Sequence, residues 1–439
     1  MNSSKNLLEL LKTVSTVIVI TALLFVVANI GAYLYIQSKP SLLKTKEHQI
    51  NDKTAAERSK IMNHILSTDT GRLHFYGLES QEEVNKFYSD EGSFNEFQSY
   101  VHWKNFETPS ENKHQRVHKA GYRYAGDYRI EGDDGPWPPN AKNFNIFFFG
   151  GSTAYGSGVP DLATVAGYLQ DISNQQLNLK KNIYVYNFGR AGYQSTQEIF
   201  LLQLLLQKGF IPDATVHLDG LNDFCYDDGL PADAYIISNI YNKSYYQYYK
   251  NIDINNTQDE KYTKASIFSK LVNRIEKILS DTPAVRLMYA YLNQLEDKDI
   301  PSYDDRMVID QEDKPSEELI KSVIDRYIVN MSIVEGIAKK FSFLPILVWQ
   351  PIPTYKYDTK HHPFYPNKLG CHIKSKYGYP VFYDQLKYDV LSKNFIWAAD
   401  INEHEKTSLF VDGFHYNAYE SKKIAQFIIN EIEARDLLR

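Results

Sequence analysis

The chain has 439 residues, 43% of them hydrophobic, which suffices for one large domain with insertions or for two ordinary domains. The net charge is −6 at pH 7 and Lys and Arg form no dense block, which excludes the basic surface of a nucleic-acid-binding protein. Two cysteines, Cys225 and Cys371, are too few for a scaffold built on disulfides; we expect them either to pair in an oxidising compartment or to stay as two buried thiols.

The first predicted element is a membrane-spanning helix at residues 14–36. This segment carries no charge, and a helix needs about 20 apolar residues to cross a bilayer. A cleaved signal peptide would have a shorter apolar stretch and a small-residue cleavage site, and a buried core helix would show a polar stripe. An uncleaved anchor is therefore favoured.

The lysines around this helix indicate a cytoplasmic domain, because two precede the span and four follow it within residues 37–53. The family resemblance described below implies export instead. Against the charge count, we expect a single-pass membrane protein whose large domain lies on the periplasmic or extracellular side.

Beyond this helix the chain changes from a polar segment to a domain of alternating apolar and amphipathic runs. Residues 1–13 form a short tail, and residues 37–140 are expected to form a stalk and a lead-in segment that wraps the domain. The domain itself extends over residues 141–439. Insertions at about 225–315 and 353–395 lie where folds of this class build lids and substrate pockets.

Short apolar runs in this domain are predicted to be buried strands, and the segments between them to be helices. Capping-box patterns begin two of the helices, one at Ser195 and one at Asn417. Strands that alternate with helices predict a parallel sheet covered on both faces, with its sites at the carboxyl ends of the strands. The predicted strands are 145–149, 183–187, 214–218 and 344–349, and the predicted helices are 161–174, one from 195, 316–341 and 417–435.

The first candidate site residue is Ser152, in the sequence GGSTA at 150–154, directly after the first predicted strand. A tight turn with small neighbours would expose its hydroxyl, and a helix starting there would point backbone N–H groups at a developing oxyanion. A glycine-rich turn with a capping serine is the alternative interpretation. The glycine spacing also fits a phosphate-binding loop, but the lysine which that loop requires is absent.

Three more motifs follow later strands or precede the last helix. The sequence NFGRAG at 187–192 follows the second strand, and glycine lets a backbone N–H approach a ligand closely. Asn222 follows the third strand, where its amide could donate to an oxyanion. Asp412 and His415 precede the last helix, and an acid so placed can orient an imidazole and stabilise its charge. Each motif alone also occurs as an ordinary turn.

In this order the four motifs resemble the SGNH (GDSL-type) hydrolase superfamily, in the form of a membrane-anchored bacterial-type member. The resemblance covers roughly residues 143–224 and 344–435. It implies a three-layer α/β/α fold with a parallel, flavodoxin-like sheet. The family often has Gly-Asp-Ser where this chain has Gly-Gly-Ser, a departure that leaves the triad intact. The lead-in at 119–123 also resembles anchored, exported members.

The resemblance assigns a role to each candidate residue. Ser152 would be the nucleophile, His415 the general base, and Asp412 the acid that orients the base. Gly192 is preferred to Gly189 for the oxyanion hole because it follows a small residue, as the family glycine does. The oxyanion hole would consist of the backbone N–H groups of Ser152 and Gly192 and the side chain of Asn222.

Three other features are weaker candidates for functional residues. His361, His362 and His372 invite a metal, but adjacent histidines point in different directions and lack ligand spacing, so no metal is expected. Trp349 ends a strand beside the site and is better explained as a core residue. The tyrosines at 241–249 could stack on sugars, lie against a membrane or form a solvated surface.

These residues imply a serine esterase acting on O-acyl esters of a surface or exported glycan, with O-acetyl the favoured group, through an acyl-enzyme. An O-acyltransferase that modifies a polysaccharide, or a lipid esterase, would use the same residues. A glycan-binding module on the same scaffold is the non-enzymatic alternative. The expected partners are an acylated glycan or other ester and the membrane; no nucleic acid and no cofactor are expected.

Overall fold

The computed structural model describes part of the chain, which divides into two compact units of residues 1–60 with 242–305 and 61–241 with 306–439. The fold below belongs to the second unit. The described residues are 15–17, 20, 23–35, 69–90, 95–98, 102–105, 107–108, 112–126, 142–177, 179–230, 282, 314–365, 369–386 and 392–438.

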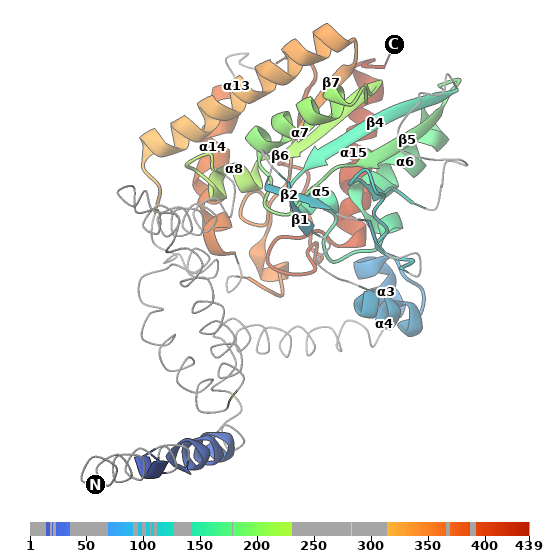
Figure 1. Ribbon diagram of the computed structural model, residues 1–439. Helices are drawn as coiled ribbons and strands as arrows, with labels where there is room; N and C mark the ends of the chain where they lie inside the picture. Colours follow the sequence, from blue (N-terminus) through green and yellow to red (C-terminus); the bar gives the residue numbers. More distant parts are fainter. Residues whose placement is uncertain are drawn as a thin grey trace, which may run out of the picture. The chain divides into compact units, whose positions relative to one another are not determined.

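A six-stranded sheet in the order β3-β5-β4-β6-β7-β8 forms the centre of this unit (Figure 1). All neighbouring strands are parallel except the short β3, which is antiparallel to β5. The parallel strands therefore follow the chain order 2-1-3-4-5, which is the flavodoxin-like order, so the predicted parallel, flavodoxin-like sheet is confirmed. The strands are β3 (Arg123–Tyr124), β4 (Asn143–Gly150), β5 (Asn182–Asn187), β6 (Ala214–Asp219), β7 (Leu344–Trp349) and β8 (Phe395–Trp397).

Helices cover both faces of the sheet, which explains why its central strands are apolar throughout. Successive residues of β4 point to opposite faces. Phe147 and Phe149 pack with Trp349 beneath α7, α13 and α14, whereas Ile146 and Phe148 pack beneath α6 and α15. These helices are α6 (Val165–Gln176), α7 (Ser195–Gln207), α13 (Glu317–Phe341), α14 (Ser375–Leu386) and α15 (Ala418–Ala434).

Short elements complete the unit. Part of the lead-in packs against the domain, since His74 of α3 stacks on Tyr419 of α15 with ring centroids 4.7 Å apart. The short helices and 3-10 turns are α3 (Asp69–Tyr76), α4 (Gln81–Asp90), α5 (Ser152–Tyr155), η2 (Asp161–Ala163), α8 (Leu221–Cys225), η3 (Thr359–His361) and η4 (Gly370–Lys374), and a separate pair of strands is β1 (Asn95–Gln98) and β2 (His102–Asn105).

Two sequence-based helix starts need correction. The helix predicted from residue 161 begins at Val165, because 161–163 form a 3-10 turn and Thr164 caps the helix by accepting from the backbone N–H of Gly167 at 2.9 Å. The capping box predicted at Ser195 is wrong: Gln194 is the N-cap, and the Ser195 hydroxyl donates to Asp223 at 2.6 Å. Asn417 does cap α15, accepting from the backbone N–H of Glu420 at 2.9 Å.

The predicted anchor at 14–36 is described only in part, at residues 15–17, 20 and 23–35, all of which are helical. Among the described residues, no helix has the length and apolar character needed to cross a membrane. The predicted tail at 1–13 and the tyrosines at 241–249 lie outside the described residues, and so do all of 37–68 and all of 231–313 except residue 282.

Candidate active site

The structure brings Ser152 next to His415, which lies 263 positions later in the sequence and contacts the neighbouring Asp412. Ser152 begins α5 at the carboxyl end of β4, and the other two lie in the loop before α15. His415 Nε2 is 2.8 Å from Ser152 Oγ, and His415 Nδ1 is 2.7 Å from Asp412 Oδ2. The three side chains thus form one continuous chain of hydrogen bonds.

Asp412 is fixed by its own loop. Its Oδ1 accepts from the backbone N–H groups of Phe414 at 3.0 Å and of His415 at 2.9 Å, which leaves Oδ2 for the imidazole. Because a carboxylate can only accept, Nδ1 carries the imidazole hydrogen and Nε2 accepts from the Ser152 hydroxyl. This is the arrangement in which a histidine can take a proton from serine.

The two glycines before Ser152 are required by close approaches. Gly150 has φ 146°, and a Cβ there would lie 2.4 Å from the Cβ of Ala154. A Cβ on Gly151 would lie 2.2 Å from Asn222 Nδ2. Asn222 therefore lies directly against the turn that carries Ser152, where the predicted oxyanion donor has to lie.

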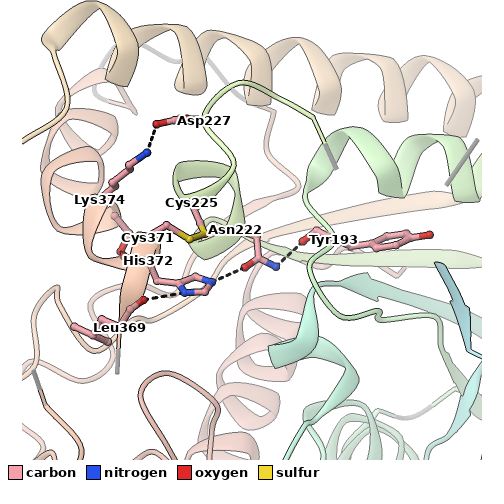
Figure 2. Close-up of a disulfide and its surroundings, with 9 residues drawn as sticks. Tyr193, Asn222, Cys225, Asp227, Leu369, Cys371, His372 and Lys374 are labelled. Carbon is pink, nitrogen blue, oxygen red and sulfur yellow. Dashed lines mark hydrogen bonds and ion pairs between the residues drawn. A yellow bond between two sulfur atoms is a disulfide. The ribbon is translucent and has the colours of Figure 1, made fainter. Parts of the chain in front are cut away.

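The predicted oxyanion residues come from three neighbouring loops. The N–H of Ser152 is the first of α5 and has no acceptor within that helix. Asn222 is buried, and its Nδ2 donates to Tyr193 O at 2.7 Å (Figure 2). Gly192 precedes Tyr193 and has φ 71°, a conformation that favours glycine. The motif at 187–192 thus meets Asn222 through the Tyr193 carbonyl.

Gly189, passed over in favour of Gly192, has a packing role. A Cβ there would lie 2.5 Å from the backbone nitrogen of Tyr155 in α5. Asn187 also holds α5, since its Nδ2 donates to Ala154 O at 2.9 Å and its Oδ1 accepts from the N–H of Gly189 at 2.9 Å. The motif therefore shapes the turn that carries the nucleophile.

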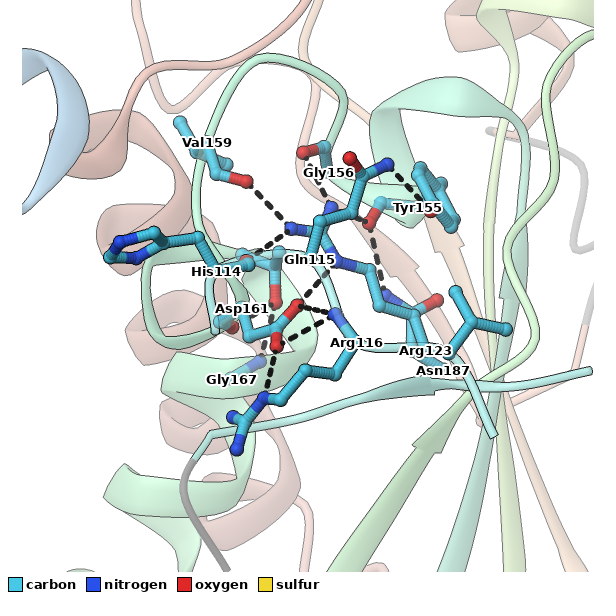
Figure 3. Close-up of polar contacts among 12 residues, drawn as sticks. His114, Gln115, Arg116, Arg123, Tyr155, Gly156, Val159, Asp161, Gly167 and Asn187 are labelled. Carbon is cyan, nitrogen blue, oxygen red and sulfur yellow. Dashed lines mark hydrogen bonds and ion pairs between the residues drawn. The ribbon is translucent and has the colours of Figure 1, made fainter. Parts of the chain in front are cut away.

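A buried arginine that the sequence did not assign to the site binds the end of α5 (Figure 3). Arg123 Nε donates to Asp161 Oδ1 at 2.7 Å, and Arg116 binds the other oxygen of Asp161, also at 2.7 Å. Burial raises the pKa of the Asp161 carboxyl, and both guanidinium groups oppose that rise. The remaining donors of Arg123 bind the carbonyl oxygens of His114, Tyr155, Gly156 and Val159.

Gln350 connects the two halves of the site. Its Oε1 accepts from the Thr153 hydroxyl at 2.8 Å, and the Tyr416 hydroxyl lies at the same distance. Thr153 follows the nucleophile and Tyr416 follows His415, so one amide holds both loops. Trp349, which precedes Gln350, is buried in the core as expected.

Two of the three histidines considered as metal ligands, His362 and His372, contact different oxygen atoms of the site. His362 Nε2 lies 3.0 Å from the carbonyl oxygen of Gly413, in the loop between Asp412 and His415. His372 Nε2 lies 3.1 Å from Asn222 Oδ1 instead. Sequence spacing could not show either contact.

Among the described residues, two groups have the spacing of metal ligands. In the first, Cys225 and Cys371 are joined in a disulfide beside His372, so they offer no thiolates. The second consists of Glu198, His217 and Asp219, all buried. Burial raises the pKa of Glu198 to about 8, also raises that of Asp219, and lowers that of His217 to about 3. Within this second group, His217 Nδ1 lies 3.1 Å from Glu198 Oε2.

No protein-family model matches the sequence, and no curated protein matches it. Matches to solved structures include a lipase/acylhydrolase from Enterococcus faecalis (14% identity, 66% of this chain and 96% of that chain, TM-score 0.31). An acetylxylan esterase from Geobacillus stearothermophilus (12%, 66% and 94%, TM-score 0.31) and an esterase from Pseudoalteromonas sp. (10%, 66% and 97%, TM-score 0.30) also match. Similarity this low establishes neither a family nor a substrate for this chain.

Proposed function

We propose that this chain is a serine esterase of the SGNH (GDSL-type) kind. The observation that carries the proposal is the continuous set of hydrogen bonds from Asp412 through His415 to Ser152. His415 Nε2 takes the hydroxyl proton as Ser152 Oγ adds to an ester carbonyl. The oxyanion is stabilised by the backbone N–H groups of Ser152 and Gly192 and by Asn222.

The tetrahedral intermediate then collapses. His415 gives its proton to the leaving alcohol, and the acyl group stays on Ser152 Oγ. A water molecule loses a proton to His415, attacks the acyl-enzyme and releases the carboxylic acid. If a second hydroxyl compound replaces water, the same residues transfer the acyl group to it.

For the substrate, we propose an O-acyl ester, with O-acetyl favoured, on a surface or exported glycan. The apolar segment at 14–36 supports a membrane anchor. The disulfide between Cys225 and Cys371 supports an oxidising compartment, and thus a catalytic domain on the extracytoplasmic side. A reporter fused after residue 439 that is active only in the cytoplasm would contradict this side.

A fluorophosphonate probe tests the nucleophile. We expect the wild-type protein to label and Ser152→Ala to stay unlabelled. Equal labelling of both, or no labelling of the wild type, refutes the serine mechanism.

Mass spectrometry of glycans from cells that carry either protein then gives the direction of the reaction. More O-acyl groups with Ser152→Ala indicate an esterase, and fewer indicate an O-acyltransferase.

A further inference from the structure

The buried imidazole of His372 contacts Asn222 from the side opposite the nucleophile turn. Its Nε2 is 3.1 Å from Asn222 Oδ1, while the other end of the same amide donates to Tyr193 O (Figure 2). A backbone carbonyl can only accept, so Nδ2 must face Tyr193 and Oδ1 must face His372. A donor at His372 Nε2 would hold the oxygen end of this amide, whose nitrogen end is held by Tyr193.

His372 can serve only one of its two contacts. Burial lowers its pKa to about 4, so the ring is neutral at pH 7 and carries one N–H. Its Nδ1 lies 3.0 Å from Leu369 O, which also only accepts. An N–H on Nδ1 would make His372 a local turn residue, whereas an N–H on Nε2 would hold Asn222.

One disulfide and one ion pair hold the segment that carries His372. Cys371, the preceding residue in η4, is bonded to Cys225, three residues after Asn222 in α8. Lys374 Nζ pairs with Asp227 Oδ2 at 2.5 Å, and so joins the same two segments a second time. The segments that carry Asn222 and His372 are thereby linked twice close to their contact.

The triad loop also packs on this imidazole. The ring of Phe414, next to His415, has its centroid 4.0 Å from that of His372. His372 therefore contacts both the residue next to the proposed base and the proposed oxyanion donor. Its chemistry is that of a positioning residue.

We propose that His372 positions Asn222 for oxyanion binding and that the disulfide between Cys225 and Cys371 keeps it there. The proposal rests on the esterase function above. If the proposal is correct, the kcat of the enzyme depends on the disulfide, although the disulfide takes no part in any step of the reaction.

Two matched substitutions separate positioning from local structure. His372→Gln places an amide N–H near the position of Nε2, and His372→Asn places one near Nδ1. We expect His372→Asn to lower kcat for p-nitrophenyl acetate by about 10-fold or more, toward the 10²–10³-fold cost of losing an oxyanion donor, with KM little changed. His372→Gln should lower kcat clearly less.

A larger loss of kcat in His372→Gln than in His372→Asn would show that His372 donates to Leu369 O and would overturn the proposal. Equal losses of kcat in the two variants would also overturn it. Urea unfolding of both variants checks that each is folded when it is assayed. Fluorophosphonate labelling of the wild type is tested separately. Its failure would remove the esterase function, whereas the order of the two variants concerns His372 alone.

The disulfide is tested with dithiothreitol, a dithiol that gives two electrons and two protons to the bridge, leaving two cysteine thiols and its own cyclic disulfide. We expect the treated wild type to fall to the kcat of the Cys225→Ser/Cys371→Ser double variant, at least several-fold below the untreated enzyme. The reagent should leave the double variant unchanged. A double variant with wild-type kcat would refute the role of the disulfide.

Discussion

Arg123→Met removes a buried guanidinium that binds one carboxylate and four backbone carbonyl oxygens around α5. Breaking a buried ion pair on one side costs about 3–5 kcal/mol, because the partner is left without compensation. Arg116 still binds Asp161, which lowers the cost. Three of the four carbonyl oxygens keep another donor, namely Asp161 N, Val159 N and Asn187 Nδ2, so the added cost is that of one unsatisfied carbonyl, Val159 O, at about 1–3 kcal/mol. We therefore expect a loss of about 4 kcal/mol in the free energy of unfolding.

Urea denaturation measures this loss. With an m value of about 3 kcal/mol/M, the midpoint of Arg123→Met should fall by about 1.3 M. Arg116→Met is the matched control, because its guanidinium binds the same Asp161 but is partly exposed, and we expect a smaller fall. A midpoint for Arg123→Met no lower than that of Arg116→Met would refute the argument that Arg123 fastens the end of the nucleophile helix.

Three further results are expected. Gly151→Ala should cut esterase activity about 10²-fold by displacing Asn222, while Gly336→Ala, whose Cβ meets nothing within 4 Å, should have wild-type activity. Gln350→Leu should lower the free energy of unfolding by about 1–3 kcal/mol, read from urea midpoints, because the buried Thr153 hydroxyl loses its acceptor, whereas the Tyr416 hydroxyl keeps Pro351 O. The pKa of Glu198 is raised from 4.5 to about 8, so between these pH values the folded state keeps a proton that the unfolded state has released. The free energy of unfolding, measured by urea denaturation, should therefore fall as the pH rises from about 5 to 8, and Glu198→Gln should make this fall smaller.

The central strands could be predicted from the sequence because burial on both faces demands unbroken apolar runs. The runs at 145–149, 183–187, 214–218 and 344–349 all lie within observed strands. β3 and β8 have only two and three residues, too few to show any such pattern. Their pairing depends on longer neighbours, which no local sequence signal records.

The proposed catalytic side chains could be found because each follows a strand end or precedes a helix in a recognisable motif. The side chains that hold them could not, because their contacts join distant parts of the chain. Gln350 binds Thr153 across 197 positions, and His372 meets Asn222 across 150. Neither residue belongs to a periodic pattern, so only the folded chain shows what it does.

Contacts of this kind also restrict which residue can occupy position 151, the middle position of Gly-Gly-Ser. Any side chain at Gly151 would begin 2.2 Å from Asn222 Nδ2 and 3.0 Å from Tyr193 O. Asn222 cannot withdraw easily, because Tyr193 holds one end of its amide and His372 contacts the other. Position 151 therefore has no room for a side chain while Asn222 stays in place. The Cys225→Ser/Cys371→Ser exchange removes the disulfide that holds His372 against Asn222, so Asn222 could then move away from a new side chain at position 151. Gly151→Ala should therefore lower kcat by a smaller factor in this background than in the wild type, and a double-mutant cycle on kcat would measure the coupling.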